Sequence, residues 1–182
     1  MSTRLTPDLR FLQEGMPRET WGQLPKGSLA ATWLAMHESL RHGQQWLERV
    51  ALQWQLKQLD YATFRKRFLA GSEGHFSHLH GHHRLEDQHY FPQFRRREPR
   101  LQAGFDLLHE DHAEVDAALS TLQAQVRELR AAEGETDASR ALADAIAVGI
   151  YRCGQLLTRH LDDEEDLVIP LLGTLDTPGN AA

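Results

Sequence analysis

The chain has only one cysteine, Cys153, among its 182 residues. A single thiol excludes an intramolecular disulfide and a thiolate-rich metal site, so any bound metal must use nitrogen and oxygen ligands. No stretch approaches the roughly 20 apolar residues that cross a bilayer, and the N-terminal region lacks the short apolar core of a secretory signal. Lysine and arginine number 20 against 26 acidic residues, a net charge of -6, which argues against nucleic acid or an anionic membrane as partner. We therefore expect a cytoplasmic protein with neither of these partners.

The composition, 41% hydrophobic and 25% charged, fits one globular domain with a continuous core. Apolar residues recur at helical spacing in four segments separated by short polar connections, and strand-like alternation is missing. The segments cover residues 28–54, 62–91, 99–132 and 136–169. Ser28 is a candidate N-cap of the first segment, and Thr136 and Asp137 are candidates for the fourth. This pattern predicts an all-α fold, an antiparallel up-down-up-down four-helix bundle over residues 28–172. Residues 1–27 are expected to form an irregular arm lying across the bundle, and residues 173–182 a flexible tail.

The most specific feature is a repeated pattern, His-x3-Glu-x5-Pro. It occurs as His82, Glu86 and Pro92, and again as His160, Glu164 and Pro170. Each copy is preceded by a lone histidine on an apolar helical stripe, in one case His37 and in the other His112. The chain therefore resembles two helical hairpins related by approximate internal repetition.

A four-residue spacing on a helix places the histidine and the glutamate of each copy one turn apart on the same face. If the two hairpins pack face to face, four histidines and two glutamates meet inside the bundle, where dinuclear carboxylate sites are built. The predicted metal ligands are His37, His82, Glu86, His112, His160 and Glu164. Imidazole and carboxylate without thiolate favour iron, manganese or zinc, and iron is our prediction, with carboxylates bridging two ions.

These residues lie in segments that resemble the four helical signatures of the hemerythrin-like family, the HHE cation-binding domain. The segments read MHESLR, HHRLEDQHYFP, HEDHAEVDAAL and HLDDEEDLVIP. The resemblance spans about residues 29–172 and implies metal ligation by the same six residues, with the two glutamates as bridges. It implies a cofactor of two non-haem iron ions, also joined by an oxo or hydroxo bridge, and a dioxygen, nitric oxide or peroxide ligand.

The sequence departs from the oxygen-carrying members, which place two histidines four residues apart on the third helix. Here Leu108 and Asp116 stand four residues before and after His112, while His109 lies three residues before it. One hypothesis is therefore a binding protein that stores, scavenges or senses a small gas or oxidant. Another is an enzyme that consumes peroxide, because a less saturated site leaves room for substrate.

Several alternatives stay open at the level of the sequence. A structural zinc bundle fits the ligand types, although structural zinc usually takes four ligands. A ferritin-like oxidase would need two Glu-x-x-His pairs, and Glu86 with His89 is the only pair of that kind associated with this site. The remaining histidines of residues 75–89 could form an accessory metal site. His78, one turn before His82, and Tyr90, one turn after Glu86, could also reach the metals.

Overall fold

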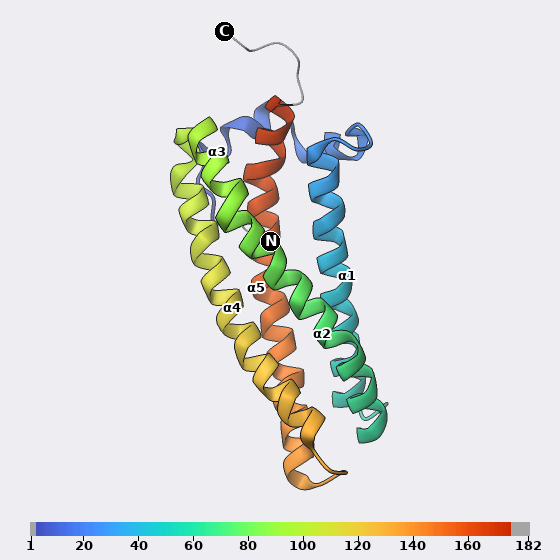
Figure 1. Ribbon diagram of the computed structural model, residues 1–182. Coiled ribbons are helices and arrows are strands. Elements are labelled where there is room, and N and C mark those ends of the chain that lie inside the picture. Colours follow the sequence, from blue (N-terminus) through green and yellow to red (C-terminus); the bar gives the residue numbers. More distant parts are fainter. Residues whose placement is uncertain (1–2, 176–182) are drawn as a thin grey trace. The chain divides into compact units, whose positions relative to one another are not determined.

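The computed structural model describes residues 3–175, and this part of the chain is helical without any strand (Figure 1). The predicted all-α class is therefore confirmed. The chain divides into two compact units. Unit 1 comprises Met1–Ser39, Arg84–Asp111 and Thr158–Ala182, and unit 2 comprises Leu40–His83 and His112–Leu157. Within the described residues, no helix is long and apolar enough to cross a membrane.

The long helices are α1 (Leu29–Gln55), α2 (Tyr61–Leu85), α4 (Gln102–Ala131) and α5 (Asp137–Leu175). A π-helical segment, η4 (Glu86–Tyr90), and a fifth α-helix, α3 (Phe91–Arg97), continue directly from α2. The 3-10 helix η5 (Pro99–Leu101) precedes α4, and three more, η1 (Pro7–Leu9), η2 (Phe11–Glu14) and η3 (Arg18–Gln23), lie in the N-terminal arm.

Ser28 is the N-cap of α1, and of the two candidates at α5 the N-cap is Thr136. The Ser28 hydroxyl accepts from the Ala31 backbone N–H at 3.2 Å, which satisfies a free donor in the first turn of α1. At α5, the Thr136 hydroxyl accepts from the Ser139 N–H at 3.1 Å, and the Ser139 hydroxyl accepts from the Thr136 N–H at 2.8 Å. This reciprocal pair fixes the start of the helix.

The helices do not end at the two prolines of the repeat, so the expected ends at Phe91 and Ile169 are wrong. Before Pro92 the backbone adopts the wider π-helical turn, in which the Phe91 N–H donates to the Glu86 carbonyl. Pro170 lies inside α5 and cannot donate to the Asp166 carbonyl four residues back. Gln13 of the arm donates its side-chain amide to that carbonyl instead, at 3.4 Å.

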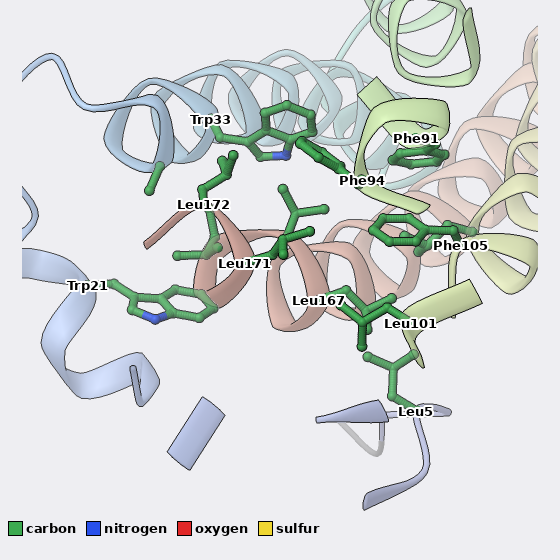
Figure 2. Close-up of a cluster of buried hydrophobic side chains, with 14 residues drawn as sticks. Leu5, Trp21, Trp33, Phe91, Phe94, Leu101, Phe105, Leu167, Leu171 and Leu172 are labelled. Atoms are coloured by element: carbon green, nitrogen blue, oxygen red, sulfur yellow. The ribbon is translucent and has the colours of Figure 1, made fainter. Parts of the chain in front are cut away.

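In unit 1 the arm packs against a buried apolar cluster formed by α1, α3, α4 and α5. Figure 2 shows Leu5 and Trp21 of the arm at this cluster, beside leucines of α5. Trp33 and Phe94 pack at a ring-centroid distance of 5.8 Å, and Phe91 and Phe105 at 5.3 Å. The arm is therefore part of the core of unit 1. The predicted tail lies largely outside the described residues, and α5 itself continues through Leu175.

In unit 2 the predicted apolar stripes are buried, including Leu47, Phe68, Leu122 and Ile150. Cys153 is buried as well, and burial raises the pKa of its thiol to about 12, in agreement with an inert core residue. His75 of α2 is buried too, and one of its ring nitrogens is 3.1 Å from the side-chain oxygen of Gln44. Burial, and then the neighbouring His78, lower the pKa of His75 to about 4.

This shift predicts a pH dependence of stability. Unfolding returns the pKa of His75 from about 4 to about 6.5, so the unfolded state binds more protons between these values and stability falls as the pH falls. Between pH 7.5 and pH 5, wild type should lose about 2 kcal/mol of unfolding free energy more than a His75→Gln variant does. Urea unfolding at the two pH values measures the difference. His78→Gln, at an exposed position, should keep most of the wild-type dependence, and equal losses in wild type and His75→Gln would contradict this account.

Candidate metal centre

The carboxylate of Glu164 lies fully buried in unit 1 among three nitrogen groups. Trp33 Nε1 donates a hydrogen bond to Glu164 Oε1 at 2.7 Å. His37 Nε2 lies 3.3 Å from the same oxygen, and His160 Nε2 lies 3.1 Å from Oε2. Trp33 and His37 are one turn apart on α1, whereas His160 and Glu164 are one turn apart on α5. Two helices thus direct their side chains to one carboxylate.

A second buried carboxylate, Glu86, lies beside Glu164. Glu86 is the first residue of the π-helical segment. Ligand atoms of His37, Glu86 and Glu164 lie within 4.8 Å of one another, and so do ligand atoms of Glu86, His160 and Glu164. These two sets of three share both glutamates, and each adds one histidine. This arrangement suits two cations held side by side with the carboxylates between them.

The protonation of these groups shows how strongly the two glutamates differ. Burial, and then the charge of Glu164, raise the pKa of Glu86 well above its usual range. Burial would also raise the pKa of Glu164, but His37 and His160 hold it well below its usual range. For His37, burial lowers the pKa, whereas Glu164 and then Glu165 raise it to about 9. The surroundings therefore favour the anionic form of Glu164 and the neutral form of Glu86, and an added positive charge would favour ionisation of Glu86.

The chemistry of this donor set fits a metal cation. Divalent cations are bound by neutral imidazole nitrogen and ionised carboxylate oxygen, and a cation would replace the protons that His37 and Glu86 otherwise hold. Buried carboxylates are costly unless they are paired or coordinated. His37, Glu86, His160 and Glu164 each have 0% of their surface exposed. A cation bound among them would therefore pair with both buried carboxylates.

The outward-facing nitrogens of both histidines also have carboxylate partners. His37 Nδ1 lies 3.0 Å from Glu165 Oε1, and His160 Nδ1 lies 3.7 Å from Asp111 Oδ2. In both rings Nε2 is therefore the nitrogen that faces Glu164. A carboxylate at Nδ1 orients a ligand imidazole and leaves the lone pair of the other nitrogen for the metal.

The structure brings four of the six predicted ligands together in unit 1, namely His37, Glu86, His160 and Glu164. His82 and His112 belong to unit 2, where both are buried. There the ring of His112 stacks on His83, with centroids 4.1 Å apart and an interplanar angle of 12°. His82 and His112 stay predicted ligands.

The additional candidates His78, His109 and Tyr90 lie in different surroundings. His78 is exposed, so its predicted inward orientation is wrong. His109 is exposed and bonds to Asp87 at 2.9 Å. Tyr90 packs on Trp33, at a centroid distance of 4.9 Å, and on Phe94 at 5.9 Å.

Sequence reasoning missed the roles of Trp33, Asp111 and Glu165, and it missed that His83 is buried. It assigned a role to Glu164 alone among residues 162–166, and none to any tryptophan. In the structure Asp163, Glu164, Glu165 and Asp166 are all buried.

The two glutamates predict different effects on the stability of the metal-free protein. Glu164→Gln removes the anion that lies between His37 and His160, and breaking such a buried pair should lower the free energy of unfolding by about 3–5 kcal/mol. Glu86→Gln replaces a neutral acid with an amide of the same shape, so its cost should stay below about 1 kcal/mol. Urea unfolding in the presence of a chelator compares the two variants. Equal costs would show that the charge is not localised on Glu164.

Comparison with known proteins gives one family. The family model of the hemerythrin HHE cation binding domain matches residues 28–172 of the chain. Searches of curated proteins and of solved structures returned no match. The matched residues include all six predicted ligands, and the buried histidine and glutamate groups fit the cation site that the family's description names. The chain therefore belongs to the hemerythrin HHE cation-binding domain family.

Proposed function

We propose that the protein holds two non-haem iron ions and uses them to bind or react with dioxygen, nitric oxide or peroxide. The observation that carries this proposal is the pair of buried glutamates shared between two sets of ligand atoms, one with His37 and one with His160. Each set supplies one nitrogen and two carboxylate oxygens. Two ions bound in this way would lie close enough to act on one small ligand.

We include His82 and His112 as the fifth and sixth ligands because of their spacing in the sequence. His82 precedes Glu86 by four residues, and α2 runs into η4 without interruption. His112 directly follows Asp111, the carboxylate that faces the ligand His160. With the four long helical stretches arranged up-down-up-down, as the sequence predicts, each metal position would gain one more histidine.

Iron is the metal that best fits this set of donors. Carboxylates shared between two ions, with imidazole nitrogens on both sides, form a hard to intermediate donor set without sulfur. Structural zinc is usually held by four ligands in a closed tetrahedron, whereas this proposal has six ligands and two shared carboxylates. When bound, iron would supply redox chemistry and an open position for a small ligand.

The protein's own residues would hold and shield the pair. Trp33 donates to Glu164 and would restrict the orientation of that carboxylate, while its ring packs against Tyr90 and Phe94. Trp33 belongs to the apolar cluster of unit 1, so this cluster lies next to Glu164 and would exclude bulk water from it. Shielding of this kind favours small uncharged ligands such as dioxygen, nitric oxide and hydrogen peroxide.

A peroxide-consuming enzyme is the second candidate, and one observation favours it. The positions four residues before and after His112 hold Leu108, which is buried in the apolar cluster of unit 1, and Asp116, which faces His80 and His83 in unit 2. Neither position supplies the extra histidine of the oxygen carriers. A site with fewer protein ligands would leave more room for a reacting molecule.

Metal content tests the proposal directly. Protein purified without added metal should contain two irons per chain, and it should absorb in the visible range with bands that shift when azide is added. Metal analysis and optical spectra before and after peroxide provide the measurement. Sustained decomposition of peroxide would select the enzyme, whereas a single zinc ion per chain would contradict both functions.

Substitution of the predicted ligands tests the assignment. His82→Ala and His160→Ala should each lose iron and lower the melting temperature, because metal binding and folding are coupled. His78→Ala is a matched control, since His78 lies one turn before His82 but is exposed, and it should keep wild-type iron content. Unchanged iron content in both ligand variants would refute the assignment.

A further inference from the structure

The N-terminal arm precedes the residues that match the family model, which begin at residue 28. Nevertheless, two of its arginines contact carboxylates that surround the candidate metal centre in unit 1. Arg4 lies between Asp163 and Asp111, with Arg4 Nε 3.1 Å from Asp163 Oδ2 and Arg4 Nη2 bonded to Asp111 Oδ2. The Thr3 hydroxyl also donates to Asp163, at 2.7 Å.

Arg18 makes the corresponding contacts farther along the arm. Arg18 Nε lies 2.6 Å from Asp166 Oδ1, and Arg18 Nη1 lies 3.8 Å from Glu165 Oε2. Arg18 Nη2 donates to the Asp162 carbonyl at 2.7 Å, and the guanidinium lies 4.9 Å from the ring centroid of Trp21. These contacts fix the arginine side chain from several directions.

The two arginines lead to the two ligand histidines through one carboxylate each. Arg4 contacts Asp111, whose Oδ2 faces His160 Nδ1 at 3.7 Å. Arg18 contacts Glu165, whose Oε1 faces His37 Nδ1 at 3.0 Å. In both histidines the opposite nitrogen, Nε2, faces Glu164. Two chains of contact therefore run from the arm to the same central carboxylate.

Charge explains why these contacts matter. Asp111, Asp163, Glu165 and Asp166 are all buried, and Arg4 and Arg18 of the arm bring positive charge to them. Arg159 also lies 3.3 Å from Asp111. A carboxylate that orients a histidine must keep one position and stay ionised. A guanidinium on the other side of the carboxylate holds it in one position, because it supplies several donors in a fixed plane. The positive charge of the guanidinium also favours the ionised carboxylate.

We propose that Arg4 and Arg18 are positioning residues of the metal centre, which hold Asp111 and Glu165 so that His160 and His37 present Nε2 to the metal. This inference rests on the proposed metal-binding function. It makes the arm part of the metal centre although the arm contributes no ligand.

A simpler role for the arm is structural attachment, since Leu5 and Trp21 are buried in the apolar cluster and Gln13 bonds to the Asp166 carbonyl. Both roles predict that loss of an arginine lowers stability. Only the positioning role predicts that each arginine affects one particular histidine. The experiment must therefore observe the two histidine rings separately.

The first experiment uses the full chain loaded with zinc, which is diamagnetic, and records long-range ¹H–¹⁵N spectra of the histidine rings. In wild type, His37 and His160 should both carry their proton on Nδ1. Arg4→Met should shift or broaden the Nδ1–H signal of His160 and leave that of His37 in place, whereas Arg18→Met should do the reverse. Arg4→Lys, which keeps the charge, should partly restore the His160 signal.

Arg10→Met is the matched control, because Arg10 belongs to the same arm and no ion pair joins it to these carboxylates among the contacts of the described residues. It should leave both signals at their wild-type positions. If Arg4→Met and Arg18→Met likewise leave both signals unchanged, or if all three variants perturb both rings equally, the positioning role is wrong and the arm only attaches.

The second experiment measures metal affinity by competition with a chelator. Loss of an outer contact of this kind should weaken binding by about 10-fold to 100-fold for Arg4→Met, with less effect for Arg4→Lys. In an Asp111→Asn background, Arg4→Met should cause little further loss, because the arginine acts through that carboxylate. Additive losses would contradict the proposed chain of contact. Failure of wild type to bind any metal would instead overturn the proposed function, and the inference with it.

Discussion

The arrangement of unit 1 depends on the buried carboxylate of Glu164. An ionised carboxylate without partners in an apolar interior costs several kcal/mol or becomes protonated. Here Trp33, His37 and His160 supply nitrogen groups within 3.3 Å of its two oxygens, and these groups come from two helices. The position of Glu164 therefore constrains how α1 and α5 present their side chains to each other in this unit.

The helix continues past the proline in both copies of the repeat. In the first copy the π-helical segment begins at Glu86, whose carbonyl accepts from the Phe91 N–H. In the second copy Pro170 cannot donate to the Asp166 carbonyl, two residues after Glu164, and Gln13 of the arm donates to that carbonyl. A proline can therefore follow a ligand at fixed spacing without ending the helix that carries it.

The local part of this structure could be predicted from the sequence. Helical periodicity identified His37, Glu86, His160 and Glu164 as inward-facing, because that assignment depends only on residues within one or two turns of each other. The same reasoning failed for His78. Along an α-helix, a step of four residues turns about 40° beyond a full turn. His82 lies near the edge of the buried face, so His78, four residues earlier, faces solvent.

The helix ends and the surroundings of the acidic run could not be predicted in this way. The Asp166 carbonyl, which Pro170 leaves without its helical donor, accepts from Gln13 of the arm, and no local pattern links these two positions. Residues 162–166 look solvated when only their neighbours in sequence are considered. They are largely buried because Arg4 and Arg18 approach from the other end of the chain. Helical periodicity predicts the direction in which a side chain points, but it does not predict which residues that side chain contacts.

The candidate metal centre therefore consists of the predicted ligands and of the groups that contact those ligands. The predicted ligands are encoded by short spacings within residues 28–172, which is the part that the family model matches. The contacts behind the ligands combine Asp111 and Glu165 of the matched part with arginines of the arm that precedes it. Since the orientation and basicity of an imidazole ligand depend on the group at its second nitrogen, equal ligand sets need not give equal metal chemistry. Within this family, the segment that covers the outer carboxylates would then be one source of functional difference between chains with the same ligands.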